Sequence, residues 1–293
     1  MFRGCYTAIV TPFKESGVRS PVDWEGFKEL IDFQDESGVA GIVACGSTGE
    51  SATLSIEEHN EVISFVAEHS TGQTIGGTGS NSTWEAIEMT RHAEDVGAAA
   101  SLQVCPYYNK PNQEGLYRHF AAVAEAVDIP IILYNVPSRT VREIEPSTMA
   151  RLAREYSNIV GVKEASGREE VWQAIRRECP DDFIILSGND EDTFRLMRDY
   201  GATGVISVAS NLLAKELADF VGLGLSGRFD EMEREHERLS EVFKAFFIDT
   251  NPIPIKQALN SRGFRAGGYR LPLCEMTEEK KRELEEVLGR VLG

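Results

Sequence analysis

The sequence has 293 residues, of which 42% are hydrophobic, and its 30 basic and 47 acidic residues give a net charge of −17. This length suits either one closed α/β barrel or two ordinary domains. The acidity argues against a nucleic-acid partner, because binding to a polyanion depends on lysine and arginine neutralising phosphates. No apolar run reaches the roughly 18 residues of a membrane span, and no signal-length apolar core opens the chain, so we expect a cytoplasmic protein with no membrane partner.

Five cysteines and five histidines are spread widely along the chain. The cysteines lack any CxxC pair and the histidines lack any HExxH pair, which are the spacings that suggest zinc or redox chemistry. The sequence therefore predicts reduced thiols, and neither a metal nor a cofactor.

Short apolar segments alternate with stretches of helical spacing. Eight segments read as buried strands: 6–10, 41–45, 74–77, 99–105, 130–134, 159–163, 183–187 and 204–207. A helical pattern follows each of them, and Ser55 with Glu58 and Ser82 with Glu85 supply helix caps. Eight β-α alternations predict a closed (β/α)8 TIM barrel, an α/β fold. The doubly wound alternative requires a glycine-rich turn after the first strand, and this turn is absent.

The chain continues beyond the residues that a barrel needs. The stretch 222–227 interrupts the apolar pattern, and further helices follow it, carrying Leu239 and Val242 in one and Leu284 and Leu288 in the last. We expect a catalytic barrel over 1–224 and an all-helical extension over 225–293. The apolar stripes of the extension can pack on the barrel or on another subunit.

Lys163 is the residue that most needs an explanation, because it ends a strand that is otherwise wholly apolar. A strand-end lysine is either a solvated terminator or a reactive amine. Catalytic groups of barrels come from the C-terminal ends of strands. The other strand ends carry Thr11, Ser47, Thr48, Tyr107, Tyr108, Tyr134, Gly188 and Ile206. This gathering of hydroxyl groups around one amine favours chemistry.

A lysine amine has a pKa of about 10.4 and must lose its proton before it attacks a ketone. Burial at the mouth of a packed barrel, with hydroxyl rather than carboxylate neighbours, is expected to lower the pKa of Lys163 and to suit a Schiff base with a keto acid. Glu164 should point away from the barrel axis. Tyr134, Ser47 and Tyr108 can form a hydroxyl chain that carries protons. The turn 46–49 is expected to offer N–H groups to a substrate carboxylate.

Seven motifs together resemble the 4-hydroxy-tetrahydrodipicolinate (dihydrodipicolinate) synthases, a branch of the pyruvate-dependent class I aldolase family that also includes the N-acetylneuraminate lyases. The motifs are GSTGES at 46–51, PYYNKP at 106–111, YNVPSRT at 134–140, GVKEA at 161–165, LSG at 186–188, GVISV at 204–208 and NPIPIK at 251–256. The likeness runs from about Gly4 to Leu273.

The resemblance implies that Lys163 forms a Schiff base with pyruvate and that Thr48 helps to hold the pyruvate carboxylate. It also implies that Tyr134, Ser47 and Tyr108 relay protons, with Tyr108 reaching across an interface of a homotetramer built as a dimer of dimers. Serine at position 47 departs from the threonine usual in the synthases and matches the neuraminate lyases, and the hydroxyl is kept.

The resemblance further implies that Arg139 binds the carboxylate of L-aspartate 4-semialdehyde, and that Gly188 and Ile206 offer carbonyls near the lysine. The pathway would be lysine and diaminopimelate biosynthesis. Val141 stands where a glycine commonly follows. The alternatives are an aldolase of the same family that acts on a sugar acid, N-acetylneuraminate or 2-keto-3-deoxygluconate, and a non-catalytic keto-acid-binding barrel.

Feedback inhibition by lysine in this family uses a pocket that can be matched to this chain. The matching positions are Ser51, Ala52, His59, Asn81, Glu85 and Tyr107. A histidine common in that pocket is replaced by Ile56, so we expect weak or absent inhibition by lysine.

Overall fold

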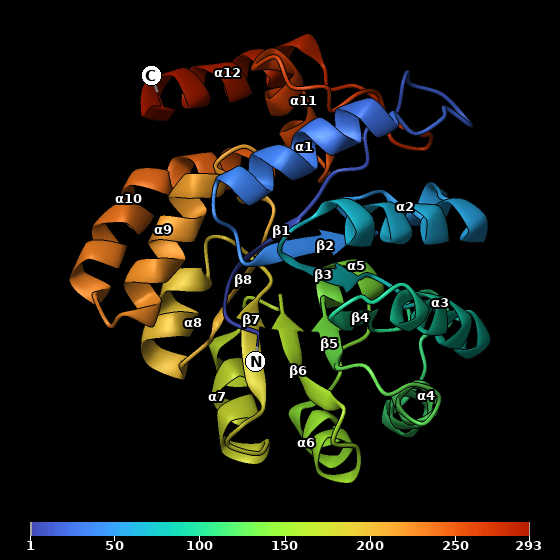
Figure 1. The fold of residues 1–293 in the computed structure, drawn as a ribbon. Helices are drawn as coiled ribbons and strands as arrows, with labels where there is room; N and C mark the ends of the chain where they lie inside the picture. Colours follow the sequence, from blue (N-terminus) through green and yellow to red (C-terminus); the bar gives the residue numbers. More distant parts are fainter. Residues whose placement is uncertain (1, 293) are drawn as a thin grey trace.

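Eight parallel strands close into a barrel in sequence order in the computed structural model, which describes residues 2–292 (Figure 1). The strands are β1 (Gly4–Ala8), β2 (Gly41–Ala44), β3 (Gln73–Gly76), β4 (Ala100–Val104), β5 (Ile131–Asn135), β6 (Ile159–Glu164), β7 (Ile184–Ser187) and β8 (Gly204–Ser207). The predicted TIM barrel is confirmed.

One long helix follows each strand and forms the outer layer of the barrel (Figure 1). These helices are α1 (Trp24–Glu36), α2 (Ile56–His69), α3 (Thr83–Asp95), α4 (Gln113–Ala124), α6 (Pro146–Glu155), α7 (Glu169–Glu178), α8 (Thr193–Tyr200) and α9 (Ala214–Leu225). Shorter turns are η1 (Ser51–Thr53), α5 (Pro137–Thr140) and η2 (Ala209–Asn211). The capping box of Ser55 and Glu58 begins α2, and the Ser82 hydroxyl accepts from the Glu85 N–H at the start of α3.

The strands are apolar on both faces because each face lies against a separate core. Along β5, Ile132 and Tyr134 face the barrel interior, whereas Ile131 and Leu133 pack under the helices. This is the pattern of a parallel sheet that is covered on both sides.

The first strand lies two residues earlier than predicted. Ile9 and Val10 are as buried as the strand itself, so their apolar character does not mark where pairing stops. The chain leaves the sheet because the Val10 N–H donates to the Asn211 side chain rather than to a neighbouring strand.

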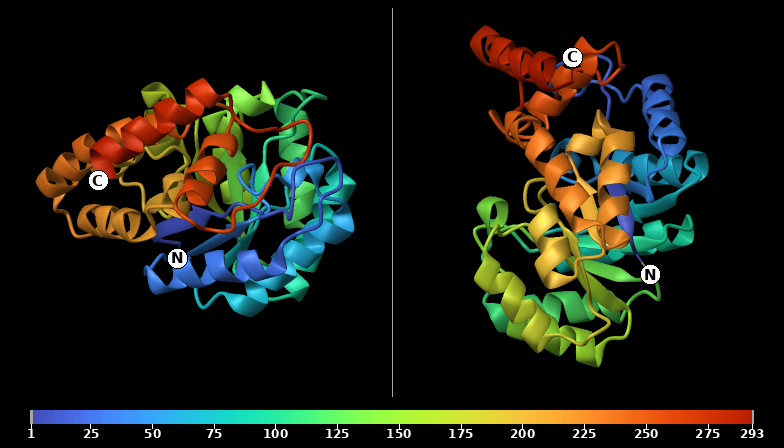
Figure 2. Two further views of the ribbon diagram at one scale, coloured as in Figure 1. Left: turned by 90° about the horizontal axis from the view of Figure 1, so that it is seen from above. Right: turned by 90° about the vertical axis from the view of Figure 1, so that its left-hand side faces the viewer.

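The extension consists of α10 (Phe229–Ala245), α11 (Ile253–Ser261) and α12 (Glu278–Leu292). Helix α10 packs against α8, α9 and α12, and these helices gather on one side of the barrel (Figure 2). Leu239 and Leu284 are fully buried there. The interruption expected over 222–227 is shorter than predicted, because α9 continues through Leu225.

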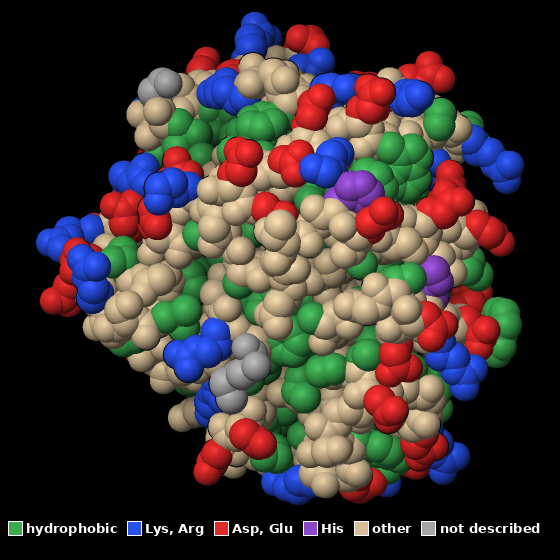
Figure 3. Space-filling model, viewed as in Figure 1, with side chains coloured by type: hydrophobic (Ala, Val, Ile, Leu, Met, Phe, Trp, Pro, Cys, Tyr) green, Lys and Arg blue, Asp and Glu red, His purple; other side chains and the backbone are tan. Residues whose placement is uncertain are grey.

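Charged side chains of both signs are interspersed around the margin of the face shown in Figure 3. Within residues 2–292, no helix combines the length and the apolar character needed to cross a bilayer.

Candidate active site

A cavity of about 620 Å³ opens where the strands end, and Lys163 lines it. The barrel contributes residues from the loops after β2, β5, β6, β7 and β8. Its lining is Ser47, Thr48, Tyr134, Val136, Ser138, Arg139, Lys163, Ala165, Ser166, Gly188, Asn189, Val208, Phe247, Asp249, Thr250 and Asn251. The predicted convergence of a lysine with hydroxyl groups is therefore present.

Lys163 is only 6% exposed, and its Nζ lies 4.3 Å from the centre of the Tyr134 ring. Burial lowers the pKa of Lys163 to about 7, because the ammonium loses its hydration; the Asp190 carboxylate raises this pKa, and the Arg139 guanidinium lowers it. About half of the amine is thus neutral at pH 7, which is the form that attacks a carbonyl.

The expectation of hydroxyl rather than carboxylate neighbours around the lysine is wrong, because Asp190 acts on it. Asp190 is 2% exposed, and its Oδ2 accepts from the N–H groups of Ala209 and Val208 at 2.9 and 3.1 Å. Its Oδ1 has no hydrogen-bond partner within residues 2–292. Burial raises the pKa of this carboxyl, and Lys163 opposes that rise. The signal in the sequence was an acid placed two residues after the strand-end Gly188.

Tyr134 lies beneath the lysine with a buried hydroxyl group. Burial raises the pKa of Tyr134, while the Arg139 charge and the neighbouring Ser47 hydroxyl lower it. The phenol therefore keeps its proton near neutral pH, and it can pass that proton on through Ser47.

The turn that carries Ser47 and Thr48 is tightly wound. Cys45 and Glu50, on either side of it, have φ values of 55° and 54°, a region that non-glycine residues seldom occupy. The Gly49 N–H donates back to the Gly46 carbonyl. The N–H groups of Ser47 and Thr48 have no main-chain acceptor in the described chain, so they remain available to an anion.

Glu164 faces away from the barrel axis, as predicted. It is 0% exposed, and its carboxylate accepts from the Asn135 side-chain amide at 2.9 Å and from the Ser166 N–H at 2.6 Å. Asn135 in turn accepts from the Ile144 N–H. This outer network fixes the ends of β5 and β6, which carry Tyr134 and Lys163 on their inner side.

Arg139 lies on α5 at the rim of the cavity. Its Nη2 donates to the main-chain carbonyl of Asn251 at 3.1 Å, which leaves its other donors for a ligand. Val141 follows α5 with a φ of 62° and a side chain that is 69% exposed. A β-branched residue is strained in this conformation, which a glycine would adopt more readily.

The matching family model is described as the dihydrodipicolinate synthetase family, and it covers residues 1–291. This chain belongs to the dihydrodipicolinate synthetase family.

Three members of the family illustrate the likeness. The 4-hydroxy-tetrahydrodipicolinate synthase of Methanocaldococcus jannaschii is 51% identical over 98% of each chain. The crystal structure of dihydrodipicolinate synthase from Aquifex aeolicus is 45% identical, with a TM-score of 0.95 over 99% of this chain and 98% of that one. The structure of the Cyanidioschyzon merolae enzyme with lysine bound is 39% identical, with a TM-score of 0.94 over 99% of this chain and 98% of that one.

The family resemblance also assigned Gly188, Ile206 and Tyr108 to the site, and only the first of them lines the cavity. Gly188 lines it, and its N–H donates to the Glu164 carbonyl at 2.7 Å. A Cβ at Gly188 would lie 2.6 Å from that of Ala165, so only glycine fits this approach. Ile206 is fully buried in the barrel interior. Tyr108 is 88% exposed, has a φ of 68°, and does not reach the cavity of its own chain.

A second cavity of about 300 Å³ adjoins the first and contains part of the predicted lysine pocket of the dihydrodipicolinate synthetase family. Ser51, Ala52 and Tyr107 line it. The other three residues lie outside that lining. His59 is 5% exposed, with its Nε2 2.9 Å from the Gly77 carbonyl, Asn81 donates to the Tyr107 carbonyl, and Glu85 accepts from the Ser80 hydroxyl.

The sequence missed the contribution of the extension to the larger cavity, which Lys163 lines. Phe247, Asp249, Thr250 and Asn251, which lie between α10 and α11, form one of its walls. The motif NPIPIK at 251–256 had marked the segment as part of the family resemblance, but its place beyond the barrel gave no reason to assign it to the site.

Proposed function

We propose that the protein is a 4-hydroxy-tetrahydrodipicolinate synthase, which condenses pyruvate with L-aspartate 4-semialdehyde for lysine and diaminopimelate biosynthesis. The observation that carries the proposal is the buried Lys163 amine, with a pKa of about 7, in a cavity that Thr48 and Arg139 also line. Two anion-binding groups suit two substrates that each carry a carboxylate. The 51% identity to a curated synthase over nearly the whole chain supports the choice of substrates.

The reaction begins when the neutral Nζ of Lys163 adds to the ketone carbon of pyruvate and forms a carbinolamine. Loss of water gives the imine, and loss of a methyl proton gives the enamine. Each step moves a proton, which Tyr134 and Ser47 carry. Thr48 and the free N–H groups of its turn hold the pyruvate carboxylate.

The enamine carbon then attacks the aldehyde carbon of the semialdehyde, whose oxygen takes up a proton and becomes a hydroxyl group. Arg139 orients this second substrate through its carboxylate. The substrate amine finally attacks the imine carbon, which closes the ring and releases Lys163 as a free amine. No external oxidant or reductant enters the balance.

Tyr108 completes the proton relay of a neighbouring subunit in a homotetramer arranged as a dimer of dimers. Its exposure of 88% supports this role, as does the exposure of two further aromatic groups, Trp84 at 67% and Tyr107 at 38%. Exposed aromatic groups are typical of interfaces. The five free thiols fit a reducing compartment, so we place the enzyme in the cytoplasm.

Steady-state assays with alternative substrates test the assignment. Pyruvate consumption is measured with L-aspartate 4-semialdehyde, beside cleavage of N-acetylneuraminate and of 2-keto-3-deoxygluconate. We expect turnover with the semialdehyde alone. Turnover of only a sugar acid would show that the role given to Arg139 is wrong.

A further inference from the structure

Asn251 joins the two groups that hold the two substrates. Its side chain is 5% exposed, and its Nδ2 donates to the Thr48 Oγ1 at 2.9 Å. Its main-chain carbonyl accepts from Arg139 at 3.1 Å. A single residue of the extension therefore contacts both Thr48, which is proposed to bind the keto acid, and Arg139, which is proposed to bind the aldehyde substrate.

The direction of the bond to Thr48 decides what the threonine hydroxyl can do. A hydroxyl group has one proton to donate and two lone pairs to accept with. Since the Asn251 amide donates to Thr48 Oγ1, the proton of that hydroxyl is left for another acceptor. A carboxylate is a stronger acceptor for this proton than a neutral group, because hydrogen bonds to charged groups are about twice as strong as neutral ones.

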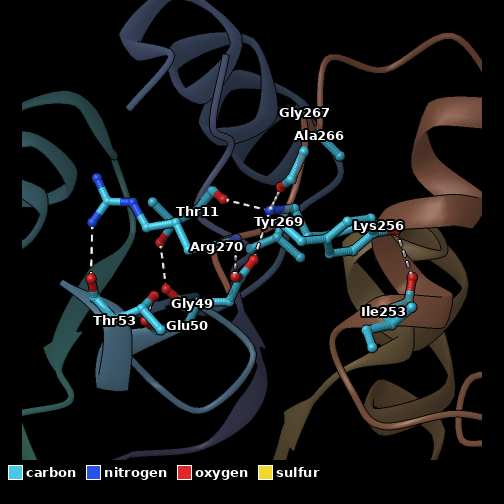
Figure 4. Close-up of polar contacts among 12 residues, drawn as sticks. Thr11, Gly49, Glu50, Thr53, Ile253, Lys256, Ala266, Gly267, Tyr269 and Arg270 are labelled. Carbon is cyan, nitrogen blue, oxygen red and sulfur yellow. Dashed lines mark hydrogen bonds and ion pairs between the residues drawn. The ribbon is translucent and has the colours of Figure 1, made fainter. Parts of the chain in front are cut away.

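A buried ion pair between Lys256 and Glu50 joins the helix that follows Asn251 to the turn of Thr48 (Figure 4). Lys256 on α11 and Glu50 are both 0% exposed in their side chains and lie 2.7 Å apart. Lys256 also donates to two main-chain carbonyls, one of them that of Thr11 at 2.9 Å. The turn of Thr48 is thus attached to the segment of Asn251 at two points, which fixes the geometry before a substrate binds.

We propose that Asn251 is a positioning residue that turns the Thr48 hydroxyl proton toward the carboxylate of the keto acid. The proposal rests on the function above, because it takes Thr48 as the group that binds this carboxylate. It also gives the extension a part in binding the first substrate.

A double-mutant cycle tests the proposal. Asn251→Ala, Thr48→Val and the double variant are compared for the pyruvate concentration that gives half-maximal borohydride-trapped adduct, read by intact mass. We expect each single change to raise this concentration about tenfold or more. The double variant should lie within about twofold of Thr48→Val, because Asn251 acts through the hydroxyl that this variant lacks. If the fold-changes of the two single variants multiply in the double variant, the proposal is overturned, since Asn251 then acts independently of Thr48.

A second variant tests the direction of the hydrogen bond and does not depend on the alanine variant folding. Asn251→Asp keeps the shape and an acceptor but loses the donor, so the Thr48 hydroxyl would give its proton to the new carboxylate. We expect pyruvate binding at least as weak as in Asn251→Ala. Binding equal to that of the unmodified protein would refute the assigned direction.

Asn260→Ala is the matched control for a purely structural effect. Asn260 lies on α11, accepts from the N–H groups of Ala266 and Gly267, and does not line the cavity that contains Thr48. This variant should lower the melting temperature and leave half-saturation by pyruvate unchanged. If the unmodified protein does not trap pyruvate on Lys163, the proposed function itself is rejected. If it traps pyruvate normally but the fold-changes multiply in the double variant, only the role of Asn251 is rejected.

Discussion

The Asp190 carboxylate raises the pKa of Lys163, and replacing Asp190 by asparagine removes this negative charge. Burial is the largest influence on the pKa of Lys163, the Asp190 carboxylate opposes it, and the Arg139 charge adds to it. Asp190→Asn keeps an oxygen that can accept from Val208 and Ala209 but removes the negative charge. The pKa of Lys163 should therefore fall below its value of about 7.

The size of the effect follows from the fraction of neutral amine. With a pKa of about 7, Lys163 is neutral in about 10% of molecules at pH 6 and in about 90% at pH 8. An ordinary lysine, with a pKa of about 10.4, is neutral in only about 0.04% of molecules at pH 7. Burial thus increases the reactive form roughly a thousandfold at pH 7, and the variant should increase it further below pH 7.

The assay is the rate of borohydride trapping at limiting pyruvate, measured from about pH 5 to about pH 9. The unmodified protein should reach half of its plateau rate near pH 7, and Asp190→Asn should reach it at lower pH. Asp192→Asn is the matched control, because Asp192 is close in sequence but is not among the charges that act on Lys163. A midpoint for Asp190→Asn that is unchanged, or moved to higher pH, would refute this account of the amine.

Four further changes test other parts of the structure. Val141→Gly should raise stability by about 0.5–1 kcal/mol, because relief of a positive φ outweighs the added chain entropy. Lys256→Met leaves Glu50 buried and unpaired and should cost about 3–5 kcal/mol, seen as a lower melting temperature. Arg139→Ala should raise the KM for the semialdehyde about a hundredfold, while pyruvate is still trapped once the pH is raised to offset the higher pKa of Lys163. Millimolar lysine should inhibit weakly, and Ile56→His should increase the inhibition.

Each of these expectations has a clear contrary result. A destabilised Val141→Gly protein would mean that the valine side chain contributes more than its conformation costs. Glu50→Gln can be added to Lys256→Met. If it recovers none of the lost stability, the unpaired carboxylate is not the cause of that loss. Equal losses of pyruvate and semialdehyde binding in Arg139→Ala would remove the distinction between the two carboxylate sites. Strong inhibition of the unmodified protein by lysine would reject the importance of position 56.

The barrel could be predicted from the sequence because local pattern determines it. Parallel strands buried on two faces are continuous apolar runs, and the helices between them have their own spacing and caps, so all eight β-α units were found. The exact ends were less predictable, since Ile9 and Val10 are buried although they lie beyond the end of β1. Likewise, the helical run to Leu225 continues through glycines that local propensity disfavours.

Only the site residues at or just after the ends of strands could be predicted from the sequence. Lys163, Tyr134 and Ser47 end or follow strands, and a closed barrel brings such ends together. Asn251 lies in the extension, and only the packing of α11 on the turn after β2 brings it to Thr48. Asp190 follows a strand end, but its action on the lysine depends on the fold of the loops after β7 and β8.

Mapping the trapped adduct tests the central claim most directly. The protein is loaded with stoichiometric pyruvate and reduced with borohydride, either at once or after addition of L-aspartate 4-semialdehyde, and its peptides are weighed. We predict a reduced pyruvate adduct on the peptide that contains Lys163, its absence from Lys163→Ala, and its loss when the semialdehyde is added first. An adduct on a different lysine, or one that persists in the presence of the semialdehyde, would contradict the account.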